Sequence, residues 1–227
     1  MKRLHHIALF VSIAAIPVFA TAGDTSVDDF LAKMDKTASS FNGMSSDISQ
    51  TKYTAVISDK STESGAFVMK KTGRDVRALI NFTKPDPKSV GFAGQKAEIY
   101  YPAMKTVQEY DLGKQSNMVE QFLMLGFGTT GKELKANYAV KMVGSEDIAA
   151  HKTVHLSLLP KSPSVKDQFS RFEIWMDESG QYPVQQQVFQ PSGDYYLITY
   201  NNIKVNPSLT DASLAMKLPK GVKREKH

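Results

Sequence analysis

Two histidines of this 227-residue chain have a spacing that suits metal chemistry. His151 and His155 are four residues apart, which is the spacing of zinc ligands on a helix. However, the alternation around them predicts a strand, on which four residues span about 13 Å, too far for one ion to bridge. We therefore interpret both as surface histidines of a strand and predict no metal site.

Covalent and acid–base chemistry lack a recognisable motif. The absence of cysteine excludes disulfides and thiolate nucleophiles. The Gly-x-Ser-x-Gly motif of serine hydrolases is absent, and the segment Gly126-Phe127-Gly128 lacks the further glycine of a dinucleotide-binding loop. We predict that the chain is not an enzyme and carries no cofactor. A hydrolase of the cell envelope, acting through a pair of carboxylates that no motif reveals, is the alternative.

The N-terminus has the pattern of a secretory signal. Lys2 and Arg3 precede an apolar run over residues 7–20, which is too short to span a membrane comfortably. Ala20-Thr21-Ala22 then fits a cleavage site. We expect a signal peptide at residues 1–22, cleaved after Ala22, and a mature chain 23–227 exported to the periplasm. An uncleaved N-terminal anchor is the alternative.

The charge balance is mildly basic. The formal net charge is +5, and it falls to +3 when Lys2 and Arg3 leave with the signal. Much of the remainder lies in the tail 217–226, which is either a solvated end or a contact for anionic headgroups or an acidic partner. Nucleic-acid binding would need a strong basic stripe, so we predict no nucleic-acid partner.

The elements that must position any site are mostly strands. A helix is predicted from residue 30 to 41, because one stripe recurs there at spacings of three and four, formed by Phe30, Leu31, Met34, Thr37, Ala38 and Phe41. From residue 44 the period changes to two, with turns such as 59–61 between short segments. The pattern predicts about ten antiparallel strands in one domain over 23–227, ending with an edge strand at 214–220.

One short segment departs from this period. Residues 118–125 predict a helix that is apolar all round, stopped by Gly126 and Gly128, with a second short helix near 132–136. A helix apolar on every side must be covered on more than one face. It is therefore either buried deeply or it roofs a cavity, and the sequence leaves both interpretations open.

The ordered set of segments resembles a known family. It resembles the LolA-like periplasmic carriers of outer-membrane lipoproteins, including the lipoprotein-sorting proteins. Nearly the whole mature chain takes part, and the clearest pattern is Gly94-x-x-x-Glu98-x-Tyr100-x-Pro102. The other segments that carry the resemblance are 30–41, 48–52, 65–71, 81–85, 172–177 with Gly180 and Pro183, and 218–222.

The resemblance implies a mainly β (α+β) fold, an incomplete antiparallel β-barrel with helices covering its concave face. It implies a monomeric carrier that shuttles lipoproteins or lipids from an inner-membrane exporter to an outer-membrane acceptor. Acyl chains would enter between the sheet and a lid formed by 30–41 and 118–125. The predicted lining residues are Leu31, Met34, Phe67, Met69, Ile80, Phe82, Val119, Phe122, Leu123, Ile174 and Met176.

Two departures from the family pattern bear on the lid and on the cargo. Glu98 stands where the family usually has tryptophan, and Lys71 stands where it has an arginine thought to hold the lid helices. A lysine offers a point charge rather than a planar fork. Lid control is therefore predicted for Lys71, Arg74 or Arg77, and a module that carries or senses a free lipid remains the alternative function.

Overall fold

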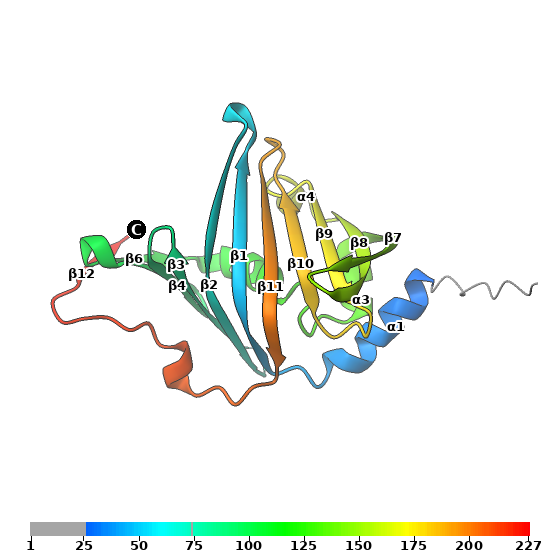
Figure 1. The fold of residues 1–227 in the computed structure, drawn as a ribbon, viewed down its shortest axis with the longest axis horizontal. Coiled ribbons are helices and arrows are strands. Elements are labelled where there is room, and N and C mark those ends of the chain that lie inside the picture. Colours follow the sequence, from blue (N-terminus) through cyan, green and yellow to red (C-terminus); the bar gives the residue numbers. More distant parts are fainter. Residues whose placement is uncertain (1–25, 74) are drawn as a thin grey trace, which may run out of the picture.

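A computed structural model describes residues 26–73 and 75–227. Its main feature is one open sheet of twelve strands in the order β12-β6-β5-β4-β3-β2-β1-β11-β10-β9-β8-β7 (Figure 1). All neighbours are antiparallel except β12 and β6, which run parallel. The strands are β1 Gly43–Thr54, β2 Asp59–Thr72, β3 Asp75–Lys84, β4 Lys88–Ala93, β5 Lys96–Tyr101, β6 Thr106–Asp111, β7 Tyr138–Ile148, β8 His151–Pro160, β9 Arg171–Asp177, β10 Pro183–Phe189, β11 Tyr195–Val205 and β12 Lys223–Lys226.

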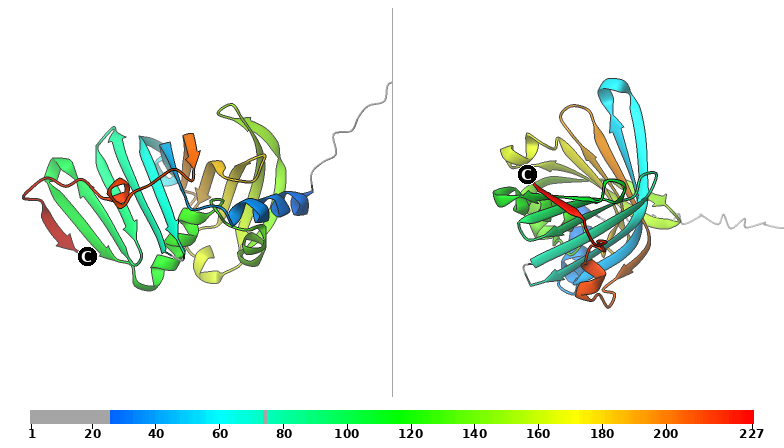
Figure 2. Two further views of the ribbon diagram at one scale, coloured as in Figure 1. Left: turned by 90° about the horizontal axis from the view of Figure 1, so that it is seen from below. Right: turned by 90° about the vertical axis from the view of Figure 1, so that its left-hand side faces the viewer.

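Helices occupy the inside of the curved sheet. Figure 2 shows α1, α2 and α3 within the curve, while the segment that leads to β12 crosses the opposite, convex face. The helix α1 begins after Ser26, whose side chain accepts a hydrogen bond from the Asp29 backbone N–H as an N-cap. The helices are α1 Val27–Ala38, α2 Ser116–Met124, α3 Gly131–Asn137 and α4 Pro163–Lys166, with 3-10 turns η1 Ala55–Ile57, η2 Pro102–Met104, η3 Gly113–Gln115 and η4 Asp211–Leu214.

The predicted fold class is confirmed, since the sheet is curved, unclosed and covered by helices on its concave face. Gly126 and Gly128 end the apolar helix as predicted, both with positive φ, which glycine adopts without steric cost. The strand count is twelve rather than about ten. The additional pairing includes β12, which is four residues long and carries no hydrophobic alternation.

Two local predictions were wrong. The segment 214–220 is not an edge strand, because η4 ends at Leu214 and the edge is formed later by β12. Residues 59–61 are not a turn, because they pair within the β1–β2 hairpin and the chain reverses at η1 instead. In both places the polarity of the residues does not match the structure: apolar residues form the turn at η1, and charged residues form the strand β12.

The core consists of two hydrophobic clusters on the concave face. The first, here the α1 cluster, joins α1 to β8, β9 and β10 and contains Phe30, Leu31, Met34, Leu156 and Ile174. The second, here the β2 cluster, joins β1–β4 and β11 and contains Met44, Phe67, Met69, Phe82 and Phe127. Val76, Ala78 and Phe82 point into this second cluster, as their alternation in β3 predicts.

The predicted signal peptide, residues 1–22, lies outside the described residues. Among the helices that are described, none is both long and apolar enough to cross a membrane.

Candidate functional site

The helix α2 lies where the two clusters meet. Phe122, in the middle of α2, packs against both the α1 cluster and the β2 cluster. Its ring stacks on Phe169 with centroids 6.4 Å apart. Val119 and Leu123 face the β2 cluster only. The helix therefore acts as a roof that spans the junction between two apolar layers.

The structure places all eleven predicted lining residues on this concave side. Leu31, Met34, Ile174 and Met176 belong to the α1 cluster; Phe67, Met69, Ile80, Phe82, Val119 and Leu123 belong to or pack on the β2 cluster; Phe122 packs on both. Met69, Ile174 and Met176 have no exposed surface. In contrast Ile80, Val119, Phe122 and Leu123 are only half-buried, so the predicted set divides into a closed core and a partly open border along α2.

The partly open border forms an apolar strip beside α2. On the helix it consists of Val119 and Leu123, and on the sheet and its connection it includes Ile80, Val90 and Leu112. Each of these five side chains is half-buried. Half-exposed apolar residues that border the same cluster are typical of a surface that another apolar molecule covers.

The C-terminal end of α2 is anchored in the core. Leu125 is 2 % exposed, Phe127 is fully buried, and the Phe127 ring meets the Tyr200 ring edge-on with centroids 5.2 Å apart. A Cβ at Gly126 would lie 2.9 Å from Met176 Sδ, so only glycine fits there without displacing a neighbour. This end of the roof is fixed by packing.

A buried polar pair adds to that anchor. Gln186 on β10 is 2 % exposed, and its Nε2 donates a 2.6 Å hydrogen bond to the Leu125 carbonyl oxygen at the end of α2. Tyr200 Oη on β11 donates a 2.7 Å hydrogen bond to Gln186 Oε1, and burial raises the pKa of that phenol well above its ordinary value. The pair therefore ties the exit of α2 to two central strands.

The N-terminal end of α2 continues directly from η3 and, within residues 75–227, has no side-chain cap. In the described part of the chain, its N-cap Gln115 makes no side-chain capping bond, and the first turn has no acidic residue. A capping side chain usually contributes about 1 kcal/mol to a helix. The neighbouring α3, by contrast, has a complete capping box between Thr130 and Glu133. This end is nevertheless in contact with its surroundings, because Ser116 is buried and its Oγ donates a 2.8 Å hydrogen bond to the Gly113 carbonyl oxygen of η3.

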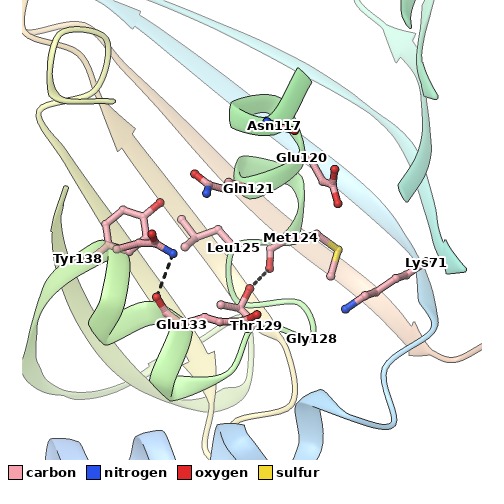
Figure 3. A pocket seen from close by; sticks show the side chains of 11 residues that line it. Lys71, Asn117, Glu120, Gln121, Met124, Leu125, Gly128, Thr129, Glu133 and Tyr138 are labelled. Atoms are coloured by element: carbon pink, nitrogen blue, oxygen red, sulfur yellow. Dashed lines mark hydrogen bonds between the residues drawn. The ribbon is translucent and has the colours of Figure 1, made fainter. Parts of the chain in front are cut away.

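A surface pocket of about 390 Å³ opens between α2 and α3 (Figure 3). Its lining combines polar side chains with one flank of α2, the roof helix, which we also call the lid. Lys71 extends into the pocket from the end of β2. The lining residues are Lys71, Asn117, Glu120, Gln121, Met124, Leu125, Gly128, Thr129, Glu133, Asn137 and Tyr138. This lid pocket is too polar to enclose an acyl chain along its length, because such sites are lined mostly by apolar groups.

The residues predicted to control the lid are Lys71, Arg74 and Arg77, and the structure describes two of them. Lys71 faces α2 across the lid pocket, opposite the helix that carries Glu120 (Figure 3). Arg77 is on the convex face, where its Nη1 lies 3.1 Å from Asp211 Oδ1 of η4. Arg74 lies outside the described residues. Of the two candidates that the structure describes, only Lys71 lies beside α2.

The two histidines lie away from this site. His155 is mostly buried on the convex face, contrary to the prediction, because its ring stacks on Trp175 with centroids 4.2 Å apart. Its Nε2 lies 2.9 Å from Glu173 Oε2. Within the described ranges, no group of three or more histidine, cysteine, aspartate or glutamate side chains is arranged to hold a metal ion.

Comparison with known families places the chain. A family model described as "Outer membrane lipoprotein carrier protein LolA" matches residues 39–216. The chain belongs to the LolA family. The LolA fold is that of a carrier family which binds lipids or lipoproteins. A search of curated proteins found no match.

Solved structures share this LolA fold at low sequence identity. An uncharacterized conserved protein from Thermus thermophilus has a TM-score of 0.54 and 11% identity, with 88% of this chain and 98% of that chain covered. The Mycobacterium tuberculosis lipoprotein LppX has a TM-score of 0.50 and 12% identity, covering 82% and 99%. MucB has a TM-score of 0.52 and 13% identity, covering 86% of this chain but only 64% of its own. Sequence identities this low show a shared fold and nothing more. The LolA-family chain described here spans about two thirds of the length of the MucB chain.

Gln186 and Tyr200 were missed from the sequence, although one signal was present. Val184, Gln186 and Val188 alternate on the buried face of β10, so the pattern places a glutamine in the core. A buried amide needs a hydrogen-bond partner, which marks the position as structural or functional. The identity of that partner, a main-chain carbonyl 61 residues away, is not readable from the pattern.

Proposed function

We propose that this LolA-family protein is a periplasmic carrier that shelters the acyl chains of a lipoprotein or lipid between α2 and the sheet. In this proposal it carries them from an inner-membrane exporter to an outer-membrane acceptor. The observation that carries the proposal is the half-buried apolar strip beside α2, at the edge of a helix whose other end is anchored. The family match over residues 39–216 supports the same class of function.

Cargo entry requires the roof to move. Leu125 and Phe127 fill the space below the end of α2, so the closed state leaves little room for a chain. We infer that the N-terminal part of α2 lifts while the anchored segment 125–128 acts as the hinge. Lifting would uncover Phe122, Val119 and Leu123 and open a path from the strip into the boundary between the two clusters.

Burial of the cargo supplies the driving force. Shielding an acyl chain from water stabilises the complex by about 0.8 kcal/mol for each methylene. A single long chain therefore provides enough gross free energy to offset the separation of Phe122 from its neighbours, which is worth a few kcal/mol at most. The acyl chain and α2 then compete for the same apolar surface, so the cargo binds by displacing α2 from it.

Lys71 is the proposed lid-control residue. It faces α2 from the sheet side of the lid pocket and brings a positive charge to a helix flank that carries Glu120. A lysine contributes attraction without the two-pronged hydrogen bonding of an arginine. We therefore expect the lid to open more readily than in relatives that have an arginine at this position.

The polarity of the strip is the direct test of this function. The variant Leu123→Gln places an amide in the apolar strip, and it should weaken binding of an environment-sensitive fluorescent acyl probe at least about tenfold, because the amide is desolvated by the bound chain. Leu159→Gln is the matched control, since Leu159 is 50 % exposed on β8 and outside both clusters. Equal probe affinity in wild type and Leu123→Gln would overturn the proposed site.

The second candidate is a module of the same fold that binds a free lipid. The polar lining of the lid pocket favours this second function, because a small lipid headgroup could bind beside Lys71, Gln121 and Asn117. The two candidates differ in cargo. A triacylated protein points to the lipoprotein carrier, and a free lipid points to the second function.

A further inference from the structure

The most exposed large apolar residues of the described chain lie together at one point. Val56 is 90 % and Ile57 is 68 % exposed, and both belong to η1 at the tip of the β1–β2 hairpin. This hairpin extends beyond its neighbours at the upper edge of the sheet in Figure 1. Scattered exposed apolar residues need no explanation, but two adjacent ones at the end of a long projection do.

The tip is rigid rather than a loose loop. β1 and β2 pair without interruption up to Thr54 and Asp59, and Ser58 closes the turn with a φ of 51°. The backbone N–H of Ala55 donates a 2.8 Å hydrogen bond to Asp194 Oδ1 in the adjacent β10–β11 turn. The fold therefore presents Val56 and Ile57 to solvent at a fixed position.

The residues in this turn are not those that usually form turns. Turns usually carry Gly, Pro, Asn, Asp or Ser, and the polar residues that suit a turn, 59–61, lie instead within the strand pair. An apolar tip lowers solubility and gains nothing from the core. Places where a local rule is broken without a gain in packing are often functional sites.

Aromatic residues form a layer directly behind the tip. Tyr53 stacks on Tyr195 with ring centroids 4.9 Å apart, and Phe189 lies 5.8 Å from Tyr195. All three are half-buried, and Tyr53 is three residues from Val56, within about 10 Å along the strand. Lys60 Nζ lies 5.9 Å from the Tyr53 ring centroid, at the level of this layer.

We propose that the β1–β2 tip inserts into the surface of a lipid bilayer. The hairpin carries two aliphatic residues at its end and, just behind them, aromatic rings together with Lys60, and a bilayer interface accepts aliphatic side chains deeper than aromatic rings and lysines. A convex tip of two aliphatic side chains offers no groove to grip a protein segment, whereas acyl chains yield around it. This goes beyond the carrier function, because it concerns contact with the membrane and not with cargo.

The charges at the tip are balanced. Lys52 and Lys60 are offset by Asp59 and Asp194, and Asp194 also accepts the Ala55 hydrogen bond. Attraction to anionic lipid is therefore not the main source of binding. The contact should depend on apolar insertion and should persist at high salt, unlike binding through a basic patch.

Vesicle flotation of the full mature chain tests the proposal. The probe is a vesicle of phosphatidylethanolamine with a minor share of phosphatidylglycerol, at low and at high salt. We expect the bound fraction of wild type to survive high salt, and the double variant Val56→Asp/Ile57→Asp to bind at least about tenfold more weakly, since two aliphatic side chains no longer enter the bilayer. Val143→Asp is the matched control, because Val143 is 53 % exposed on the edge strand β7; it should bind like wild type.

A second measurement guards against a change in folding. Because the chain has no cysteine, Ile57→Cys and Val143→Cys each accept a single environment-sensitive fluorophore. A blue shift on adding vesicles at position 57 but not at 143 supports insertion. No binding by wild type, equal binding by the double variant, or no shift at position 57 overturns the proposal. Equal acyl-probe affinity in wild type and Leu123→Gln, which would overturn the proposed cargo site, would leave membrane insertion unaffected, so the two ideas fail separately.

Discussion

At the scale of single residues, the unusual feature of the site is a fully buried amide in an apolar core. Gln186 satisfies both of its ends, donating to Leu125 and accepting from Tyr200. Its hydrogen bond to a main-chain carbonyl holds the exit of α2 without contributing any apolar surface. The residue thus links the position of the lid to the two central strands β10 and β11.

Replacing this amide should loosen the lid. Gln186→Leu leaves the Leu125 carbonyl and the Tyr200 hydroxyl buried without these partners, which should lower the free energy of unfolding by about 1–3 kcal/mol. The amides of α2 should also exchange hydrogen faster. Urea unfolding and hydrogen exchange measure the two effects. Tyr200→Phe is the control, because it removes one bond and keeps the other; an effect as large as that of Gln186→Leu would contradict this arrangement.

The charge at Lys71 should set the rate of opening. Lys71→Met removes the positive charge that faces α2, so uptake of a fluorescent acyl probe should become several-fold faster, as expected for loss of an attraction of about 1 kcal/mol. Lys71→Arg supplies a planar fork and should slow uptake. Stopped-flow fluorescence distinguishes the three proteins. Identical uptake rates would exclude Lys71 from lid control.

At the scale of elements, the C-terminal strand explains one departure from the family pattern. Glu98, which replaces the usual tryptophan, lies with its Oε1 2.9 Å from Arg224 Nη1 on β12. Glu109 on β6 also pairs with Arg224, and this hydrogen bond lowers the pKa of the Glu109 carboxyl. Two carboxylates from neighbouring strands therefore hold an edge strand that has no apolar alternation of its own.

The attachment of β12 should weaken in acid. Because the pKa of Glu109 is lower in the folded chain than its ordinary value of 4.5, the folded state binds fewer protons than the unfolded state between the two values. The stabilisation is therefore complete above pH 4.5 and is lost as the pH falls through the lowered pKa. Hydrogen exchange of residues 223–226, compared at neutral and acidic pH, measures this. Glu109→Gln should remove most of the pH dependence; an unchanged profile would contradict the assignment.

At the scale of the whole molecule, the sequence predicted the parts that follow periodicity. The concave face of β3, the N-terminal helix and the stop at Gly126 could be read from spacing, because a core imposes a period of two or 3.6. The bounds of that helix were shifted, since α1 spans Val27–Ala38 rather than 30–41. The turn at η1 could not be read from spacing, because Val56 and Ile57 have strand-like chemistry in a turn. β12 could not either, because ion pairs with distant residues place it. The residues predicted to line the site share the concave side, but their division into closed core and open strip depends on the position of α2.

Carriage of acyl chains requires the closed roof α2 to open. Native mass spectrometry of the protein isolated from periplasm, with the Leu123→Gln variant beside the wild type, shows whether it does. We expect an adduct with the mass of a lipid or lipoprotein on the wild type and a much smaller share of it on the variant. Wild-type protein free of any such adduct, and unable to acquire one when incubated with acylated cargo, would show that α2 does not open for acyl chains.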